Sequence, residues 1–191
     1  LYVRDEETGR FWSPAPLPAK GSSGYVSRHG FGYSIFEHSE DGIKTELTVF
    51  VALDHPVKFA ALKIRNVSGR KRVLSAASYN ELVMGTLRDN SHMHIQTEVD
   101  PKSGALTAYN HYNKEFPGRV VFLDVSETAR FVSGDRREFI GRNGTLAAPA
   151  AMRSDGLSGK VGAGLDPCAA MQVKFELEEN EEKDIIFTFG A

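Results

Sequence analysis

Most of the chain alternates apolar and polar residues in short runs, which is the pattern of β-strands that bury one face. In the run that begins at Ile43, for example, Ile43, Leu47 and Val51 fall on one face and Lys44 falls on the other. The pattern predicts strands over residues 25–28, 31–38, 43–53, 57–66, 73–84, 92–99, 105–110, 119–125, 128–132, 169–177 and 183–189. Short turn sequences such as Asp100–Gly104 separate these runs. The spacing predicts an all-β fold, a large antiparallel β-sandwich.

Two segments break the alternation. Residues 1–24 read as an irregular entry with several prolines, and residues 134–168 form a long glycine-rich stretch without a clear period. A loop of this length in a compact domain is usually functional or disordered. Its turn sequences, Gly141–Gly144 and Gly162–Pro167, favour a shaped loop that the scaffold presents to a partner or substrate. One short helix is expected over residues 135–140, with Asp135 near its N-terminus.

Composition limits the class of protein. The 191 residues are 41% hydrophobic and 25% charged, enough for one core, so we expect a single domain over residues 1–191. The net charge of −2 provides no basic surface for nucleic acid. No apolar run approaches the roughly 20 residues of a membrane-spanning helix, and no signal peptide is evident. Because the chain does not begin with Met, we expect a fragment of a longer protein.

The single cysteine, Cys168, excludes an internal disulfide and favours a reducing compartment. It follows a proline and opens a predicted strand, so we interpret it as a small buried hydrophobic residue rather than a nucleophile. The chain contains neither a G-x-S-x-G elbow nor a P-loop. We therefore expect no nucleophilic catalysis by these motifs and no cofactor.

The long loop gathers planar, multi-donor side chains. Guanidinium and amide groups suit paired contacts to hydroxyls, carboxylates or phosphate, and a carboxylate can accept from hydroxyls. The candidate contacts of the loop are Arg136, Arg137, Arg142, Asn143 and Asp166. The alternative is that Arg136 or Arg137 pairs with the neighbouring carboxylate of Asp135 or Glu138 and only pins the loop.

Further candidates lie elsewhere. Trp12, the only tryptophan, either closes the core or offers a flat face on which a sugar ring can stack. Together with Trp12, His29 and Tyr33 are candidates for a second rim of a binding site. His92 and His94, two apart on a predicted strand, suggest a zinc site with His111 or else a polar sheet face; no accompanying ligand set supports zinc, so no metal is expected.

Four strand glutamates remain open to interpretation. Paired carboxylates perform glycoside chemistry, but exposed glutamates are common on sheets, and the sequence alone cannot pair them. These residues are Glu37, Glu46, Glu81 and Glu98. A sugar-modifying enzyme of the mutarotase kind would need His29 or His94 to face Glu37 or Glu98 in one cleft.

Five motifs occur in an order that resembles a known family. They are GRFWSP (residues 9–14), RHGFGYS (28–34), TELTVFV (45–51), GDRREFIGRNG (134–144) and GAGLDPCAAMQ (162–172). Together they resemble the N-terminal β domain of the glycosyltransferase-36 family, or glycoside hydrolase family 94, which comprises inverting disaccharide phosphorylases. The phosphorylase-like region of the cyclic β-1,2-glucan synthases is the most similar branch.

The resemblance implies a galactose-mutarotase-like supersandwich that precedes a helical linker and an (α/α)₆ catalytic barrel. In the family, the general acid and the phosphate-binding residues belong to that barrel, so this domain is expected to have no activity alone. Its loops, here residues 134–144 and 162–168, would reach toward the barrel, in some members across a homodimer. The whole protein would perform reversible phosphorolysis of a β-glucosidic bond, on the cytoplasmic side of a bacterial inner membrane.

The sequence therefore predicts a saccharide-binding, substrate-shaping domain whose ligand is a β-glucan or β-glucoside. The alternative is a purely structural domain that binds no sugar and serves as a packing or dimerisation face for the barrel. That alternative predicts exposed apolar surface around Phe11, Trp12 and Phe139.

Overall fold

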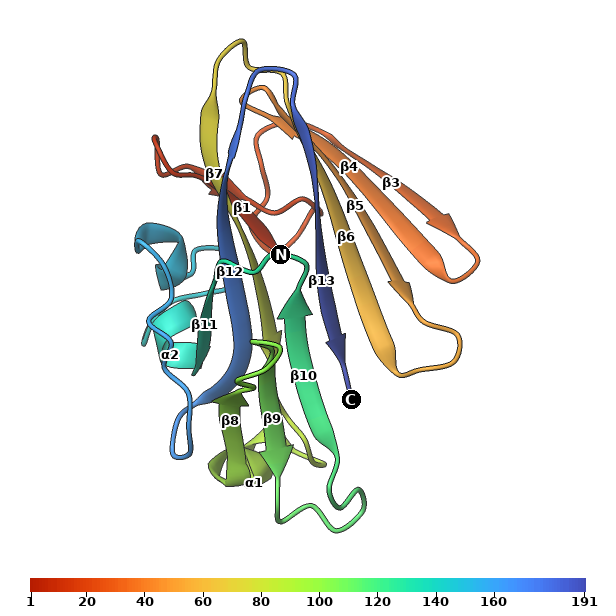
Figure 1. The fold of residues 1–191 in the computed structure, drawn as a ribbon, viewed down its shortest axis with the longest axis vertical. Coiled ribbons are helices and arrows are strands. Elements are labelled where there is room, and N and C mark those ends of the chain that lie inside the picture. Colours follow the sequence, from red (N-terminus) through yellow and green to blue (C-terminus); the bar gives the residue numbers. More distant parts are fainter.

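The computed structural model describes residues 1–191 as two antiparallel sheets packed face to face (Figure 1). The smaller sheet contains, in spatial order, β11 (Arg130–Asp135), β12 (Pro167–Leu177), β7 (Arg72–Glu81), β1 (Tyr2–Asp5) and β2 (Phe11–Trp12). The larger sheet contains β3 (Tyr25–Gly30), β4 (Tyr33–Glu40), β5 (Ile43–Val51), β6 (Val57–Asn66), β13 (Glu182–Gly190), β10 (Val120–Val125), β9 (Leu106–Asn110) and β8 (Ile95–Val99). The prediction of an antiparallel β-sandwich is confirmed.

The main core fills the space between the two sheets. Along β5, Ile43, Thr45 and Leu47 are buried and the intervening residues are not, as the alternation predicted. Facing side chains of the smaller sheet, such as Leu74 and Val173, belong to the same cluster of buried residues. Each strand thus places one set of alternate residues in a shared apolar layer, which the hydrophobic effect stabilises.

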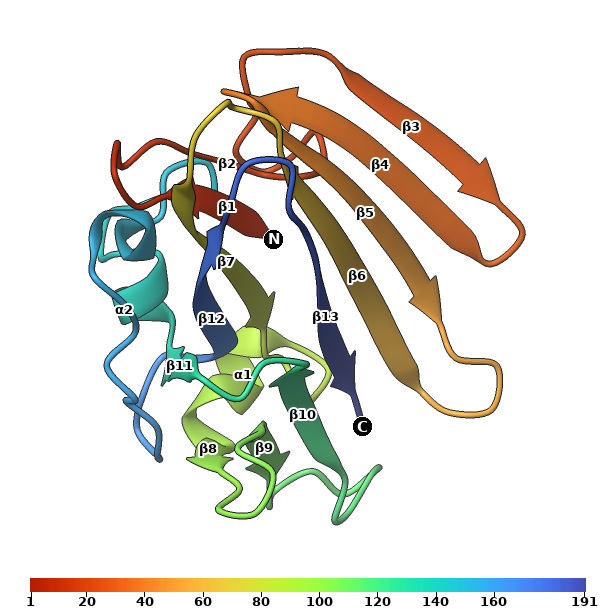
Figure 2. The same cartoon turned by 45° about the horizontal axis from the view of Figure 1, so that its top comes forward.

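The larger sheet extends past the edge of the smaller one. Figures 1 and 2 show β3, β4 and β5 as a wing with no strand of the smaller sheet opposite its outer part. The exposure agrees with this view, since nearly all of β3 is exposed. The wing therefore leaves parts of both its faces accessible.

The smaller sheet is covered on its second face as well. The segment after β11 contains two short helices, α2 (Arg136–Phe139) and the 3₁₀ helix Ala150–Arg153, which lie beside the sheet in both ribbon views. A second buried cluster joins Phe139 and Met152 of this segment to Tyr2 and Ala77 of the sheet. Consequently β7 is buried on both faces, which explains its nearly continuous run of small and apolar residues.

Two local predictions need correction. The entry segment contributes the strands β1 and β2 to the smaller sheet, so only part of it is irregular. Residues 92–94 form a 3₁₀ helix, not a strand, and follow the short helix α1 (Arg88–Ser91). Local hydrogen bonding explains the difference, because the Ser91 hydroxyl donates to the Leu87 carbonyl and the His92 backbone N–H bonds to Arg88. None of the helices is long and apolar enough to cross a membrane.

Candidate functional site

The short helix α2 begins the segment that carries most of the predicted contacts. Asp135 ends β11, and its carboxylate accepts a hydrogen bond of 3.0 Å from the backbone N–H of Arg137. This is the helix cap expected from the sequence, and it confirms the predicted helix. Phe139 and Ile140 then turn inward and are buried, so the helix is anchored to the sheet by apolar packing.

Arg136 and Asp166, two predicted contacts, are brought together. The Nη1 atom of Arg136 lies 3.7 Å from an Asp166 carboxylate oxygen, and the Arg136 backbone N–H donates to the Asp166 carbonyl at 2.7 Å. Two further residues complete the cluster: Glu81, one of the four glutamates that the sequence could not pair, and Arg88, which the sequence analysis did not include. Arg88 pairs with Asp166 and, at 2.6 Å, with Glu81, which also lies 3.5 Å from Arg136.

This cluster contains two cations and two anions that are roughly one-fifth to one-third exposed. It joins the end of β7, the start of α1, the start of α2 and the residue before β12, so it holds four chain segments together. Its charges are compensated internally, which leaves Arg136 and Asp166 less free to bind a ligand than the sequence suggested.

The alternative pairing within α2 does not occur. Asp135 pairs with Lys160, and the Glu138 carboxylate accepts from the Ser133 hydroxyl at 2.6 Å and from the Ser158 backbone N–H at 2.7 Å. Arg137 is exposed and its guanidinium has no partner. The loop is therefore pinned by contacts between distant parts of the segment, which no local spacing indicated.

Arg142 and Asn143 occupy the tip of a tight turn. The turn is closed by a hydrogen bond of 3.3 Å from the Gly144 N–H to the Gly141 carbonyl. Gly141 has φ of +93°, and a Cβ on Gly144 would lie 1.8 Å from the Ile140 carbonyl oxygen. Both positions therefore need glycine. Arg142 and Asn143 are exposed, and neither side chain makes a hydrogen bond or an ion pair, so their donors are free.

The other predicted contacts lie elsewhere. Trp12 is 1% exposed and packs in the main core, so it has no free face on which a sugar could stack. Residues Phe11 and Trp12 of the entry segment form β2, and this strand places the Trp12 indole between the two sheets. His29 and Tyr33 belong to the β3–β4 hairpin, on the opposite side of the molecule from α2 (Figures 1 and 2). These three residues do not form one rim with the loop.

The remaining sequence candidates are not arranged for chemistry. His92 Nδ1 lies 3.1 Å from the Arg88 carbonyl, and His94 stacks on Tyr112 with a centroid distance of 4.2 Å. No group of three or more His, Cys, Asp or Glu side chains is placed to hold a metal ion. His29 is paired with Ser34, so it points to the opposite face of the hairpin from Glu37.

Among the glutamates, the structure pairs Glu37 directly opposite Glu46 on neighbouring strands. Glu37 forms an ion pair with Arg28, and Glu46 lies opposite Lys63 on β6. Glu37 is thus paired with an exposed arginine, and Glu46 has a lysine as its cross-strand neighbour. This is the arrangement of a solvated sheet surface, not of a catalytic acid–base pair.

Cys168 is fully buried, as expected. Burial, together with the nearby carboxylates of Asp135 and Asp166, raises the pKa of its thiol far above the ordinary value. The thiol therefore stays protonated at neutral pH, which agrees with a packing role rather than a nucleophilic one.

Comparison with known proteins now gives the family. The family model described as "Glycosyl hydrolase 94, supersandwich domain" matches residues 1–191, which is the whole chain. The chain belongs to glycosyl hydrolase family 94. Cyclic beta-(1,2)-glucan synthase NdvB of Rhizobium meliloti (strain 1021) is 33% identical over 192 residues, which cover 100% of this chain and 7% of that protein.

Family 94 relatives also include phosphorylases. Solabiose phosphorylase of Paenibacillus borealis is 27% identical, and N,N'-diacetylchitobiose phosphorylase of Vibrio furnissii is 26% identical. Each match covers 100% of this chain and 25% of the relative. The chain therefore spans about a quarter or less of the length of the curated relatives it matches. The resemblance to this family and the supersandwich fold are confirmed.

The sequence analysis did not include Arg88 and could not pair Glu81, because their partner Asp166 is distant in the chain. Glu81 lies 85 positions before Asp166 and Arg88 lies 78 before it. The only indication in the sequence was their position at or after the end of a strand, where the loops of a sheet lie together. The antiparallel order of β7 and β12, with Cys168 opposite Glu81, is what brings the strand ends together.

Proposed function

We propose that this chain binds and positions the saccharide of a family 94 enzyme, and that the Gly141–Gly144 turn supplies direct contacts. The observation that carries the proposal is the pair of free side chains, Arg142 and Asn143, on a turn that is anchored to the sheet. A guanidinium and an amide together provide donors and an acceptor for sugar hydroxyls. Arg137, also free, is available on the same segment.

The anchoring favours binding because it reduces the ordering needed on association. The Tyr2 hydroxyl donates to the Leu146 carbonyl at 2.8 Å, and Arg4 donates to the Ser154 carbonyl at 2.5 Å. Phe139 and Met152 are buried beneath the turn. The segment is thus held by the chain's own sheet, and the binding groups are preorganised at its surface.

The proposal extends to the whole protein. The parent enzyme would be a cyclic β-1,2-glucan synthase or a related inverting β-glucoside phosphorylase, and its ligand here a β-glucan or β-glucoside. The catalytic acid and the phosphate site would belong to the helical barrel implied by the family resemblance, approached by this turn directly or across a homodimer. The chain alone would then have no activity, and it would act on the cytoplasmic side of the bacterial inner membrane.

Calorimetric titration tests the proposal. The chain is titrated with β-1,2-gluco-oligosaccharides, with cello-oligosaccharides as the comparison. We expect binding that Arg142→Ala weakens about tenfold or more, since a charge-assisted contact is lost. Arg153→Ala is the matched control, because Arg153 is an exposed arginine of the same segment without an ion-pair partner. Unchanged affinity in Arg142→Ala would contradict the proposal.

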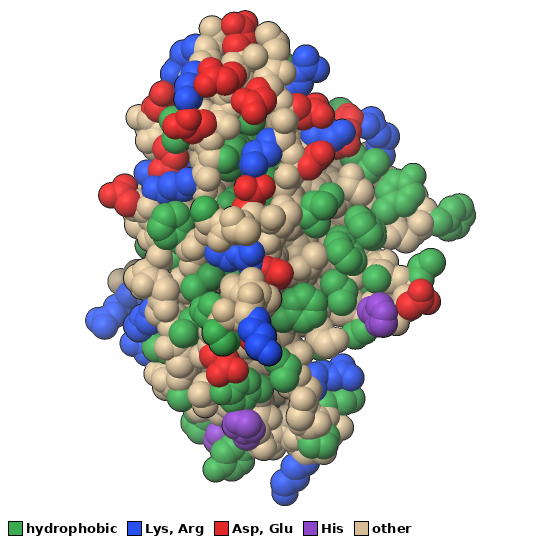
Figure 3. Space-filling model, viewed as in Figure 1, with side chains coloured by type: hydrophobic (Ala, Val, Ile, Leu, Met, Phe, Trp, Pro, Cys, Tyr) green, Lys and Arg blue, Asp and Glu red, His purple; other side chains and the backbone are tan.

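The second candidate is a structural role in which an apolar surface docks another domain or a second copy. The surface predicted for it is not present, because Trp12 and Phe139 are buried. Exposed apolar side chains occur instead at the free end of the wing, where Phe31 and Leu53 are fully exposed and Val51 is 57% exposed. Figure 3 shows hydrophobic side chains gathered there.

Sedimentation analysis separates the two candidates. If the wing docks a second copy, the chain self-associates, and Phe31→Ser together with Leu53→Ser returns it to a monomer without affecting sugar binding. A monomeric chain that binds oligosaccharide through Arg142 favours the first candidate. A chain that self-associates and gives no heat with either oligosaccharide favours the second.

A further inference from the structure

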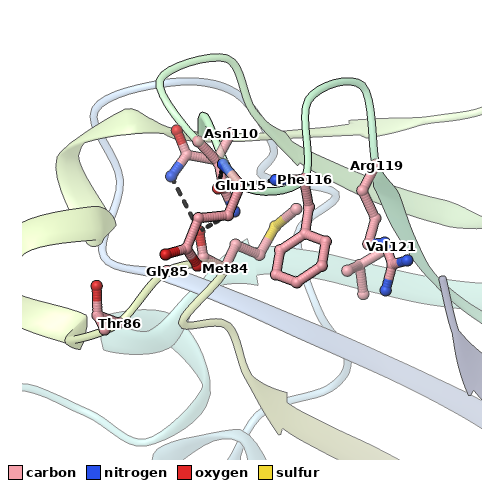
Figure 4. A pocket seen from close by; sticks show the side chains of 9 residues that line it. Met84, Gly85, Thr86, Asn110, Glu115, Phe116, Arg119 and Val121 are labelled. Carbon is pink, nitrogen blue, oxygen red and sulfur yellow. Dashed lines mark hydrogen bonds between the residues drawn. The ribbon is translucent and has the colours of Figure 1, made fainter.

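A hollow of about 390 Å³, shown from close by in Figure 4, is lined by residues of the β9–β10 loop, which lies at the lower end of the sandwich in Figure 1, and is distant in sequence from the Gly141–Gly144 turn. Its walls come from the connection between β7 and α1 and from the loop between β9 and β10. We call it the Met84–Val121 groove and define it by Met84, Thr86, Glu115, Phe116, Arg119 and Val121. Its volume lies in the range of ligand-binding pockets.

The groove continues past its first hollow. A second hollow of about 420 Å³ shares the lining from Met84 to Thr86 and extends to His94 and Tyr112. The rings of His94 and Tyr112 are stacked, 4.2 Å between centroids, and Tyr112 is 74% exposed. The two hollows therefore adjoin, and the second one adds an aromatic surface.

The backbone of the groove is fixed before any ligand binds. The amides of Asn110 and Asn113 donate to the Met84 carbonyl at 3.0 and 3.4 Å. The Asn113 side-chain oxygen accepts from the backbone N–H groups of Glu115 and Phe116 at 3.1 and 3.3 Å. Met84 has φ of +41°, a left-handed conformation that these contacts maintain. The two asparagines are thus used internally and position the loop.

The polar side chains that remain free line the groove. Thr86, Glu115 and Arg119 make no side-chain hydrogen bond or ion pair, while the ring of Phe116 lies 4.9 Å from the Arg119 guanidinium and is half exposed. Figure 4 shows Phe116 and Arg119 projecting from the same loop, with Met84 beside the ring. Apolar walls and free hydrogen-bonding groups of both kinds therefore converge on one space.

This combination selects the class of ligand. Charges of both signs, Glu115 against Arg119, disfavour a strongly anionic or cationic ligand. An apolar ligand would leave the free polar groups of the groove unpaired. A neutral polyhydroxylated ring satisfies both requirements, because its C–H face packs on an aromatic or thioether surface while its hydroxyls donate and accept.

We propose that the Met84–Val121 groove binds a pyranoside unit of an oligosaccharide, as a site separate from the Gly141–Gly144 turn. Phe116 and Met84 pack against the ring, and Glu115, Arg119 and Thr86 bond its hydroxyls. The proposal deepens the proposed function, on which the choice of saccharide rests. The second hollow, with Tyr112 and His94, receives the next unit of the chain.

Residue-resolved NMR titration tests this site. The ¹⁵N-labelled chain is titrated with β-1,2-gluco-oligosaccharides, and the amide signals of Gly85, Thr86, Glu115 and Phe116 are expected to shift together. Phe116→Ala is expected to weaken the affinity measured from these signals about fivefold or more. Phe116→Leu, which keeps an apolar wall, should weaken it less. Phe31→Ala is the matched control, since Phe31 is a fully exposed aromatic outside the groove.

The outcomes distinguish this site from the turn. Shifts in the groove that vanish in Phe116→Ala and persist in Arg142→Ala support the groove, whatever happens at residues 141–144. Shifts confined to residues 141–144 would contradict binding in the groove but would remain consistent with the proposed function. Absence of shifts at both places up to millimolar ligand overturns both. A melting curve for Phe116→Ala that matches the unchanged chain confirms that lost binding is not lost folding.

Discussion

At the upper end of the sandwich in Figure 1, polar side chains are buried and paired, whereas at the lower end several are exposed and have no partner. Asp5 and Arg72 pair with exposed side-chain fractions of 0% and 4%. Asn66, fully buried, donates to the carbonyls of Arg70 and Leu177 at 2.7 and 3.0 Å. Figure 3 shows charged side chains of both signs around this end. By contrast, Arg119 at the lower end and Arg142 on the turn make no ion pair.

The difference separates stability from binding. Hydrogen bonds at the upper end are satisfied within the chain, so they hold the turns that join the two sheets and leave little for a ligand. Exposed side-chain donors without a partner, held on an anchored backbone, have little effect on the free energy of unfolding and remain available to bind a ligand. Substitutions at the upper end should therefore affect the free energy of unfolding, and those at the lower end and on the Gly141–Gly144 turn should affect binding.

The largest effect is expected from Arg72→Met. It leaves the Asp5 carboxylate buried without its cation, and breaking such a pair costs about 3–5 kcal/mol of unfolding free energy. Urea denaturation measures the loss, with Arg142→Ala as the matched control. A loss below 1 kcal/mol for Arg72→Met would contradict the view that the upper end holds the sheets together.

Asn66→Ala should follow. The side-chain amide of Asn66 serves three carbonyls, and its oxygen accepts from the Ser68 N–H at 3.0 Å. Removing these bonds leaves buried backbone groups unpaired, at about 2–3 kcal/mol. Asn143→Ala provides the comparison, because Asn143 makes no side-chain bond. Equal losses for the two variants would remove the distinction between the regions.

Gly144→Ala tests the turn itself. A Cβ at this position meets the Ile140 carbonyl oxygen at 1.8 Å, so the turn must rearrange, with an expected loss of about 1–3 kcal/mol. Gly24→Ala is the control, since no atom lies within 4 Å of its added Cβ. The Gly144 variant should also weaken saccharide binding, because Arg142 and Asn143 are displaced. Retained affinity would show that the turn does not supply the contacts.

A fall in pH should reduce the stability of the fold, because it protonates buried carboxylates at the upper end of the sandwich. Burial alone would raise the pKa of Asp5, but hydrogen bonds from Thr8 and Arg72 lower it below the ordinary 3.8. Burial likewise opposes the hydrogen bonds from Ser22 that lower the pKa of Glu40 below 4.5. A carboxyl group whose pKa is lower in the folded than in the unfolded chain stabilises the fold at pH values above its unfolded pKa. This stabilisation is lost as the pH falls toward the folded pKa. Denaturation at pH 7 and pH 3 should show a loss of stability that Glu40→Gln reduces.

The smallest effects on folding are expected from Arg142→Ala and Asn143→Ala, within about 0.5 kcal/mol, because neither side chain is buried or paired. Their effect should appear in saccharide affinity. Thermal melts and calorimetric titrations of the same samples give the two quantities side by side. A large loss of stability without loss of affinity would reverse the assignment of roles to the two regions.

Sequence reasoning was most successful where short-range pattern decides structure. The alternation in β5 predicted the burial of Ile43, Thr45 and Leu47, although Val51 on the same face is exposed, and Asp135 was correctly placed as the cap of a short helix. Of the two readings of Trp12, the structure bears out the buried core residue and not the sugar platform, and the prediction of a strand at residues 92–94 was wrong. In the first case two short strands place the indole in the core, and in the second local hydrogen bonds favour a helical turn.

The candidate site was predicted in part. The turn glycines at 141 and 144 and the free Arg142 and Asn143 lie where the sequence indicated a shaped turn. The sequence could not show that Arg136 and Asp166 form ion pairs with Glu81 and Arg88. These residues meet only through the pairing of β7 with β12. The Met84–Val121 groove joins residues more than 30 positions apart, and no local pattern places them together.

The sequence by itself determined most of the strands, the antiparallel class, the family and the glycine-dependent turn, because each depends on periodicity, turn chemistry or motif order along the chain. Only the tertiary structure decided which polar groups are compensated and which are free. The reason is that a charge finds its partner through strand pairing and layer packing, which join residues across the whole chain. Of the arginines that looked equivalent in the sequence, Arg136 became part of a scaffold and Arg142 remained available for a ligand.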